Sequence, residues 1–473
     1  MPVKDLREWL SRIDSPAELQ RIKGADWNLE IGALTELMQQ RAPVPALLFD
    51  EIPGYPKGYR VLTNVCSSIP RLAFSLEAPG AKKAMDLISH WRKSSKDIPL
   101  IPPVEVQNGS VMENVHLGKD VNLLEFPAPK WHEADGGRYI GTGCLVVMKD
   151  PDSGWINVGT YRVMTVDEQR ATLYMSKGKH CHQIREKYWK KGQPCPVAVV
   201  MGQDPLLFIN ASMELPYGVC EYDYAGGLRK QPVEIIRGPI TGLPVPAHAE
   251  IVIEGTITEG DIAPEGPFGE WTGYYASGVK DEAVIRVQSV LHRNDPILMG
   301  ACPCKPPSEQ TFYRGPIRSA IIWDQLEAAG IPGIAGVWVH EAGAGRMLLI
   351  VSINQKYAGH SRQAGLVASQ CHGGAYASKC VIVVDDDVDI TNTNEVLWAA
   401  LTRCDPAEDV EILKKCWSTI LDPTAYYKDG GLYNSRMVID ACRPYGKLGS
   451  FPAVLGPEKE LVDRLKDKFA GLF

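Results

Sequence analysis

The sequence has no run of apolar residues long enough to cross a bilayer, which takes roughly 18 consecutive residues. Its first ten residues, Met1 to Leu10, contain no apolar core of the kind found in secretory signals. A basic surplus is also missing: the formal net charge is −7, and the longest basic cluster, Lys187 to Lys191, is short. These absences argue against a membrane protein and a general nucleic-acid binder. We expect a cytoplasmic protein with neither a membrane nor a nucleic acid as partner.

The twelve cysteines form no Cys-x-x-Cys pair, and the closest two are Cys302 and Cys304. In a long chain without a secretory signal, this spacing favours free thiols over disulfides. Paired Cys/His knuckles are missing as well, which argues against a structural zinc site.

The 473 residues suggest two or three domains at roughly 100–200 residues each. Residues 5–41 show apolar positions at helical spacing, and a second helix is expected near 81–96. From about 137 to 300, short β-rich runs separated by Gly, Pro, Asp and Asn are typical of an all-β or barrel-like domain. One helix, near 182–191, interrupts them. The expected strands are 46–49, 59–62, 144–148, 156–164, 171–175, 196–201, 250–257 and 283–292.

A helix is predicted from Pro316 to Ala329, with Pro316 in its first turn and Gly330 at its end. Strands and helices then alternate, which indicates an α/β domain with a partly parallel sheet. The expected elements are strands 336–340, 347–353 and 380–384 and helices 361–369 and 394–402. The tail, 457–473, reads as an amphipathic helix that docks on its own domain or on a neighbouring subunit. Its apolar face would consist of Leu461, Val462, Leu465, Phe469 and Leu472.

Two carboxylates, Glu265 and Glu270, lie in a Gly/Pro-rich turn that starts at Pro264. Carboxylates close together shift one another's pKa and can supply an acid and a base at neutral pH. A solvated acidic turn explains the same residues equally well. Taken alone, the segment leaves both interpretations open.

An amide, an imidazole and a carboxylate at Asn157, His180 and Glu234 form a ligand set that suits Mg²⁺ or Mn²⁺ better than Zn²⁺. Their wide separation leaves a purely structural role open for each. Arg162 follows Asn157 by an odd spacing, which puts the two on opposite faces of a regular strand unless Gly159 introduces a bulge.

Other segments carry weaker indications. Ala211 to Met213 follows an apolar run, 206–209, and reads as a strand end. Tyr357 to Arg362 suits either a phosphate site or a solvated helix start. Asp385 to Asp387 reads as a charged strand end. Gly343 to Gly345 precedes a strand and is a poor dinucleotide fingerprint.

Six segments nevertheless occur in an order and spacing that resemble the UbiD-like decarboxylase family over nearly the whole chain. They are 157–162, 179–180, 211–213, 233–234, 264–270 and 357–362. The resemblance implies an α+β/α/β multidomain fold. Its expected parts are an N-terminal α/β segment of the cofactor domain (1–130), a split β-barrel that binds the cofactor (131–312), a linking helix (313–330), a C-terminal α/β oligomerisation domain (331–455) and a C-terminal amphipathic helix (456–473).

The resemblance also implies prenylated FMN as cofactor, supplied by a flavin prenyltransferase. Asn157, His180 and Glu234 would join Mn²⁺ or Mg²⁺ to its phosphate. A K⁺ ion would be held by backbone carbonyls around Val158, Ala211, Ser212 and Met213. Further cofactor contacts would come from Gly159, Thr160, Tyr161, Arg162, Lys179, Ser212, Met213 and Arg362. The family often has Lys in place of Arg362, and Arg offers a planar fork instead of a point charge.

The implied activity is reversible, non-oxidative decarboxylation of an aromatic, heteroaromatic or α,β-unsaturated carboxylic acid by a homodimer or higher homo-oligomer. The substrate would be held covalently on the cofactor, and Glu270 would protonate the carbon that loses CO₂. Arg162 and Glu265 would complete the catalytic network. The segments 159–162 and 187–195 favour a benzoate-type or heteroaromatic acid.

Two alternatives remain. An FMN-dependent oxidoreductase on a split barrel explains the β-rich middle but gives no role to Glu265 and Glu270. A non-catalytic carrier of prenylated FMN would bind the cofactor but would not need Arg162.

Overall fold

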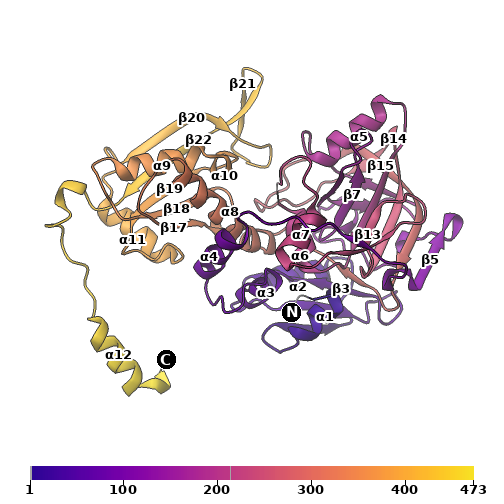
Figure 1. Cartoon of the computed structure of the whole chain (residues 1–473), viewed down its shortest axis with the longest axis horizontal. Coiled ribbons are helices and arrows are strands. Elements are labelled where there is room, and N and C mark those ends of the chain that lie inside the picture. Colours follow the sequence, from indigo (N-terminus) through magenta and orange to yellow (C-terminus); the bar gives the residue numbers. More distant parts are fainter. Residues whose placement is uncertain (1–2, 214, 473) are drawn as a thin grey trace.

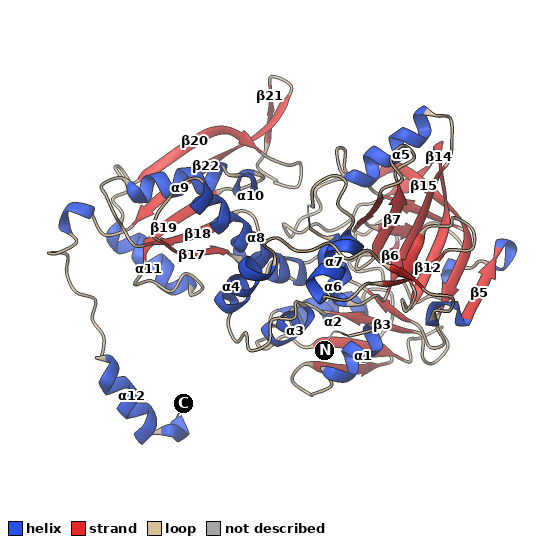
Figure 2. Cartoon of the chain, viewed as in Figure 1, coloured by secondary structure: helices blue, strands red, loops and turns tan. Residues whose placement is uncertain are grey.

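The computed structural model describes residues 3–213 and 215–472. A β-rich body made by the first two thirds of the chain is joined by a long helix to a C-terminal α/β domain (Figures 1 and 2). All twelve cysteines are free. No helix among the described residues is both long enough and apolar enough to cross a membrane.

The N-terminal part has a four-stranded sheet whose last strand comes from far along the chain. Its order is β1 (Leu19–Lys23), β2 (Ala46–Asp50), β3 (Arg60–Thr63) and β16 (Ile297–Met299). Its helices are α1 (Leu6–Arg12), α2 (Glu30–Gln39), α3 (Ile69–Ser75) and α4 (Ala84–Ser94). The expectation of helix throughout 5–41 is wrong, because β1 pairs in parallel with β2 and this tertiary pairing overrides the local helical spacing.

A nine-stranded sheet forms the centre of the body, and every pairing within it is antiparallel. The predicted β-rich region is therefore confirmed. Along the sheet the order is β6 (Arg138–Gly141), β9 (Val163–Thr165), β10 (Arg170–Leu173), β15 (Lys280–His292), β14 (Ile251–Glu265), β11 (Cys195–Met201), β7 (Leu145–Lys149) and β8 (Ile156–Gly159), and β5 (Asn114–Leu117) pairs with β15.

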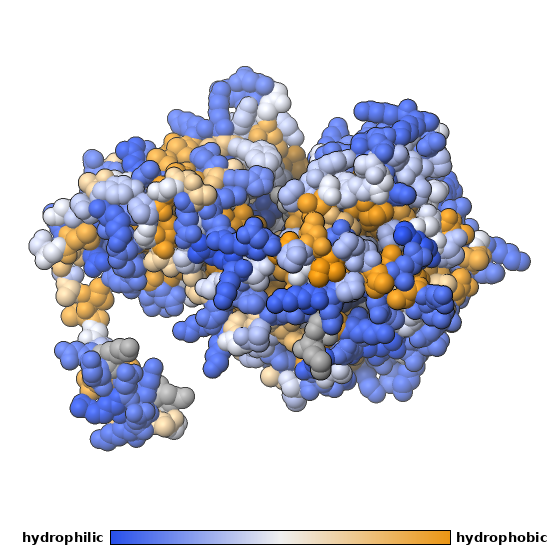
Figure 3. All heavy atoms as spheres, in the orientation of Figure 1, coloured by the Kyte–Doolittle hydropathy of each residue, from blue (hydrophilic) through white to orange (hydrophobic). Residues whose placement is uncertain are grey.

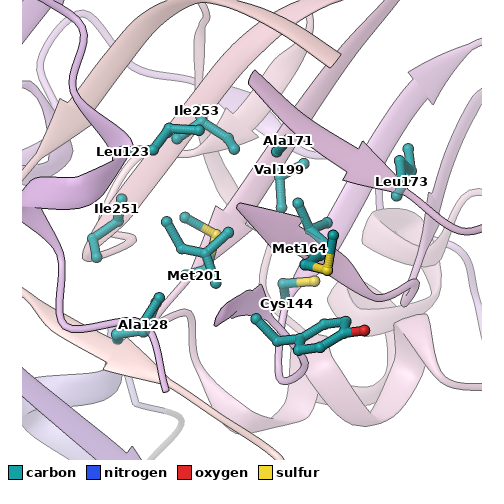
Figure 4. Close-up of a cluster of buried hydrophobic side chains, with 14 of the residues drawn as sticks. Leu123, Ala128, Cys144, Met164, Ala171, Leu173, Val199, Met201, Ile251 and Ile253 are labelled. Carbon is teal, nitrogen blue, oxygen red and sulfur yellow. The ribbon is translucent and has the colours of Figure 1, made fainter. Parts of the chain in front are cut away.

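The sheet encloses a core of buried aliphatic and sulfur-containing side chains (Figure 4). Val199 and Met201 on β11 and Ile251 and Ile253 on β14 are all at most 1% exposed. Their alternation along each strand puts one face inward, as the period of two in a β-strand requires. This rigid core supports the loops that carry the candidate site.

Three helices and a small sheet cover the body. The helices are α5 (His180–Lys190), α6 (Pro205–Ala211) and α7 (Glu221–Arg229), and the small sheet is β13 (Pro244–Pro246), β12 (Glu234–Arg237) and β4 (Val104–Glu105). The apolar run 206–209 was expected as a strand but lies inside α6. Asp204 caps this helix by accepting a hydrogen bond from the Leu206 amide, and Pro205 occupies its first turn. All seven side chains of α6 are buried, so the run has no periodicity that could separate helix from strand.

The linking helix α8 (Glu309–Ala328) begins earlier than predicted. Pro316, expected in the first turn, lies inside the helix. Ser308 is the N-cap, and its hydroxyl accepts a hydrogen bond from the Thr311 amide in a capping box. The helix packs against α4 of the body and β17 of the C-terminal domain.

The C-terminal domain has a sheet in the order β17 (Ile334–Val339), β18 (Leu348–Ile353), β19 (Cys380–Asp385), β22 (Gly431–Ala441) and β20 (Val410–Trp417), with β21 (Tyr426–Lys428) beside β22. The three middle strands are parallel and the outer pairings antiparallel, which confirms the partly parallel sheet. Helices α9 (His360–Gln370), α10 (His372–Ala375) and α11 (Thr393–Arg403) accompany it. Strands β20 to β22 were not predicted.

The last helix, α12 (Lys459–Lys468), extends away from the domain, and Figure 3 shows open space between it and the body. Leu461, Leu465 and Phe469 on its apolar face are 37%, 37% and 43% exposed. The expectation that it docks on its own domain is therefore wrong, and docking on another subunit stays a prediction. The remaining short helices are η1 (Ser110–Glu113), η2 (Gly118–Asp120), η3 (Leu123–Glu125), η4 (Glu341–Gly343), η5 (Tyr445–Lys447) and η6 (Ala470–Leu472).

Candidate active site

The two carboxylates of the Gly/Pro-rich segment meet at one guanidinium. Arg162 donates two hydrogen bonds to Glu265, each 2.8 Å long, and one of 2.6 Å to Glu270. The side chains of the three residues are 9%, 2% and 15% exposed. Such burial excludes a solvated acidic turn, so the predicted Arg162–Glu265–Glu270 network is formed.

The backbone positions each member of this network differently. Strand β8 ends at Gly159, so Arg162 lies in the loop before β9, where strand alternation no longer applies. Glu265 is the last residue of β14, not part of the turn. Gly136 touches the turn so closely that a Cβ there would lie 1.9 Å from the Gly266 carbonyl oxygen. This close approach holds the start of the turn against β6.

Aromatic rings surround the guanidinium. Arg162 lies over the rings of Tyr174 and Phe268, 4.2 and 5.0 Å from their centroids. Tyr139 packs on Phe268 and donates a 3.0 Å hydrogen bond to Glu265. The rings exclude water from the charged groups, which strengthens the electrostatic interactions among them.

The pKa shifts make the two carboxylates unequal. Burial raises the pKa of Glu270, and the nearby Glu265 charge adds to this, while Arg162 opposes it only in part. Burial works to lower the pKa of Arg162, but its bonds to Glu265 raise that pKa overall, so the guanidinium stays charged. Burial of Glu270 therefore shifts its titration toward higher pH.

Asn157 on β8 meets a carboxylate that the sequence did not predict. Its side-chain amide donates a 2.9 Å hydrogen bond to Glu221, and the Val158 amide donates one of 2.7 Å to the other oxygen of the same carboxylate. Glu221 is the first residue of α7, which packs on β8. Burial raises the pKa of Glu221 to about 8.

Glu234, predicted as the third metal ligand, has partners other than Asn157 in this structure. Its carboxylate bonds to His248 at 2.7 Å and lies 3.8 Å from Lys4, and its side chain is 42% exposed. Glu234 starts β12 in the small sheet, whereas Asn157 lies in the large one.

His180 begins α5, directly after Lys179 at the N-cap. The centroid of its ring lies 5.1 Å from the ring centroid of Trp155 and 5.6 Å from that of Tyr217. The thiol of the next residue, Cys181, lies 3.1 Å from the Asn157 amide oxygen. The first turn of α5 therefore lies beside Asn157.

The remaining predicted cofactor residues divide into two groups. Gly159, Thr160 and Tyr161 continue from Val158 toward Arg162 and so connect the Asn157 and Arg162 sites along the chain. Ser212 caps α6, its hydroxyl donating a 2.7 Å hydrogen bond to the Ile209 carbonyl, and Met213 follows it.

Arg362 is different. It lies on α9 in the C-terminal domain, its side chain is 62% exposed, and it pairs with Glu411 at 2.5 Å. The structure does not bring it to the Arg162 network (Figure 1).

The chain matches the models of a known protein family over most of its length. Three family models match it in sequence order: the 3-octaprenyl-4-hydroxybenzoate carboxy-lyase N-terminal domain over residues 10–91, the Rift-related domain over 103–306 and the C-terminal domain over 311–441. The chain belongs to the UbiD family. This confirms the resemblance and the predicted activity class, since UbiD-family relatives are carboxy-lyases.

Individual relatives of this UbiD-family chain agree. It is 34% identical to the pyrrole-2-carboxylic acid decarboxylase of Pseudomonas aeruginosa over 422 residues, 86% of this chain and 84% of the relative. The vanillic acid decarboxylase of Sedimentibacter hydroxybenzoicus in its open form matches with a TM-score of 0.87, 29% identity and full coverage of both chains. An evolved dimeric form of the UbiD-class enzyme HmfF from Pelotomaculum thermopropionicum, in complex with prenylated FMN, matches with a TM-score of 0.82 and 27% identity over 96% of this chain and 97% of that chain.

Proposed function

We propose that this protein catalyses the reversible, non-oxidative decarboxylation of an aromatic or heteroaromatic carboxylic acid with prenylated FMN as cofactor. The observation that carries the proposal is the buried Arg162–Glu265–Glu270 network, in which burial raises the pKa of Glu270. The names of the relatives support this substrate class, since one acts on a pyrrole acid and another on vanillic acid. An α,β-unsaturated acid is the wider alternative.

Within the network each residue has a distinct task. Arg162 fixes Glu265 through two parallel hydrogen bonds and holds Glu270 through one, so both carboxylates keep fixed positions. When bound, prenylated FMN supplies the electron-accepting ring system that takes up the electron pair of the breaking C–CO₂ bond. Glu270 then donates its proton to the carbon that has lost CO₂ and regains one from water. In the carboxylation direction, its carboxylate removes that proton.

For the metal, we propose Asn157, His180 and Glu221 in place of the set with Glu234. The Glu221 carboxylate accepts hydrogen bonds from two neutral amides, those of the Asn157 side chain and the Val158 backbone, and a buried carboxylate between neutral groups is costly unless a cation joins it. An amide oxygen, a carboxylate and one imidazole suit Mn²⁺ or Mg²⁺. These residues would hold the metal that binds the cofactor phosphate.

We propose further roles for the nine-stranded sheet and for the residues near the cofactor. The nine-stranded sheet would be the split β-barrel of the cofactor domain, and a K⁺ ion would sit at backbone carbonyls near Val158 and Met213. Lys179, His180 and Ser212 would contact the cofactor. The protein would work in the cytoplasm as a homo-oligomer and would depend on a flavin prenyltransferase, and the dimeric HmfF form supports the oligomer.

A panel of acids tests the proposal. The protein is produced with and without a flavin prenyltransferase and incubated in D₂O with heteroaromatic, hydroxybenzoic and cinnamic acids. We expect CO₂ release from at least one aromatic or heteroaromatic acid only in the first preparation, with one deuterium at the carbon that lost CO₂. NAD(P)H oxidation with unmodified FMN would instead indicate an oxidoreductase. Cofactor binding without CO₂ release or exchange would indicate a carrier.

A further inference from the structure

Three side chains that commonly bind metals meet at the outer edge of the nine-stranded sheet. They are His116 on β5, Glu125 at the end of η3 and His292 at the end of β15, and one ligand atom from each lies within 4.8 Å of the other two. Strand β5 pairs antiparallel with β15 in a register that sets His116 opposite Val290, two residues before His292. Both imidazoles therefore face the same side of the sheet, with centroids 5.2 Å apart.

His292 presents a nitrogen that has no partner. Its Nδ1 lies 2.8 Å from the Arg293 carbonyl oxygen, which can only accept, so Nδ1 carries the hydrogen and Nε2 carries the lone pair. The residue is 3% exposed, and no described residue forms a hydrogen bond with the buried Nε2.

Glu125 adds a carboxylate oxygen that is likewise buried without a hydrogen-bond partner among the described residues. This oxygen, Oε1, lies 3.5 Å from Nδ1 of His116. Two members of this group thus carry a buried acceptor atom without a hydrogen-bond partner among the described residues, which costs free energy unless a cation or donor reaches it.

We propose that His116, Glu125 and His292 bind one divalent transition-metal ion, with Zn²⁺ as the best match. Two imidazoles and a carboxylate are a ligand set that Zn²⁺ accepts, and a fourth position stays open for water. Tetrahedral bonds near 2.1 Å put neighbouring ligand atoms about 3.4 Å apart. The His116–Glu125 separation already fits this value, and the remaining ligand atom approaches by a small side-chain movement. The hydrogen bond from Nδ1 of His292 orients the ring from behind.

The site lies apart from the proposed decarboxylation and does not rest on it. Figure 1 places β5 at the outer edge of the body, on the side away from the C-terminal domain. A metal there would join the short segment at η3 to the edge strand β5 and to β15. The ligands come from three separate segments, so the sequence showed no paired knuckle of the usual zinc-site kind. His116 is 32% exposed, which gives the ion a route from solvent.

Metal titration of the full-length protein tests this site. Metal-free wild type, His116→Ala and Glu125→Gln are titrated with Zn²⁺, and with Co²⁺ as a coloured substitute, and bound metal is measured by mass spectrometry. His372→Ala, which removes an exposed imidazole in the C-terminal domain, is the matched control. We expect wild type and the control to bind one more equivalent than the two site variants, whose affinity at this site should fall at least roughly a hundredfold.

Two further readouts keep the test decisive. Zn²⁺ should raise the Tm of wild type and of His372→Ala more than that of the site variants. The Co²⁺ absorption of the extra equivalent should be lost in both site variants, whereas metal held at Asn157, His180 and Glu221 would remain in all four proteins. Equal Zn²⁺ uptake and equal Tm shifts in the four proteins would overturn the proposal. Should His116→Ala fail to fold, Glu125→Gln alone decides, because it conserves the shape of the side chain.

Discussion

Glu265 receives two parallel hydrogen bonds from Arg162, whereas Glu270 receives one from the same guanidinium. The two carboxylates are therefore held by one cation but are not equivalent. Glu265 is fixed in a geometry that only a planar fork provides. Glu270 is placed by the same group while burial favours its neutral form.

Replacing Arg162 tests this geometry. Arg162→Lys keeps the charge but loses the fork, and we expect the decarboxylation rate to fall by roughly a hundredfold through misplacement of Glu270.

Arg162→Met leaves the buried Glu265 carboxylate unpaired, which should lower the free energy of unfolding by about 3–5 kcal/mol. Urea denaturation measures this. Arg170→Lys, in a partly exposed ion pair with Asp167, is the control and should change the stability by less than about 0.5 kcal/mol.

Removing the proposed proton donor tests the role of Glu270. Glu270→Gln with cofactor shown to be bound should lose about 10²- to 10⁴-fold in rate, because the amide cannot protonate the product carbon. Glu259→Gln, an exposed carboxyl on the same strand as Glu265, should leave the rate unchanged. In wild type the rate should fall as the pH rises through the raised pKa of Glu270, since only the protonated form donates. CO₂ release by Glu270→Gln at the wild-type rate would contradict the assignment.

The metal assignment can be decided with two glutamates. Glu221→Gln should lose Mn²⁺ and cofactor together during gel filtration, because it removes the buried carboxylate beside Asn157. Glu234→Gln should retain both, since that carboxylate pairs with His248 instead. Metal content and flavin absorbance of the eluted protein provide the measurement. Loss in Glu234→Gln with retention in Glu221→Gln would restore the assignment made from the sequence.

Glu309, at the start of α8, should make stability depend on pH. Burial raises its pKa to about 7, although hydrogen bonds from backbone amides such as that of Cys66 oppose the shift. The folded state thus keeps a proton that the unfolded state loses above its ordinary pKa of 4.5. Stability is highest below that value and declines by up to about 3 kcal/mol as the pH rises to 7. In Glu309→Gln the free energy of unfolding should lack this decline, and an unchanged pH profile would exclude the effect.

Removing the C-terminal helix should change the oligomeric state. The apolar residues of α12 are exposed in the single chain, and burying them requires another subunit. A chain that ends at Leu455 should therefore show a smaller mass by light scattering after gel filtration, while its Tm changes little. An unchanged mass would place the subunit interface on other surfaces of the protein.

The sequence was informative where chemistry is concentrated in a short segment. Glu265 and Glu270 could be found because Gly and Pro residues cluster around them, although Glu265 itself ends β14. Arg162 could not be joined to them by strand periodicity, because β8 ends at Gly159 and leaves Arg162 in a loop. Only the family resemblance linked the three residues.

The sequence was less informative where tertiary packing decides. Nothing in the local sequence distinguishes Glu221 from Glu234 as a partner of Asn157. The packing of α7 on β8 is what brings Glu221 to Asn157. Segment 206–209 is buried on every side, so its sequence fits a strand as well as a helix. Strand β20 carries Lys414 and Lys415 on an exposed edge, and such charged edges lack the apolar alternation by which strands are recognised.

Helix α8 is shared by the two halves of the molecule. On one side Arg92 binds its Asp324 at 2.7 Å, and on another the Ser319 hydroxyl accepts a 2.9 Å hydrogen bond from the Val339 amide of the C-terminal sheet. Each residue of an α-helix adds about 100° of rotation and about 1.5 Å of length. One alanine inserted between Ser319 and Asp324 would rotate the Asp324 side chain by about 100° around the helix axis relative to Ser319, so the two contacts could no longer form together. The number of residues in this short interval therefore sets the angle at which the C-terminal domain faces the body.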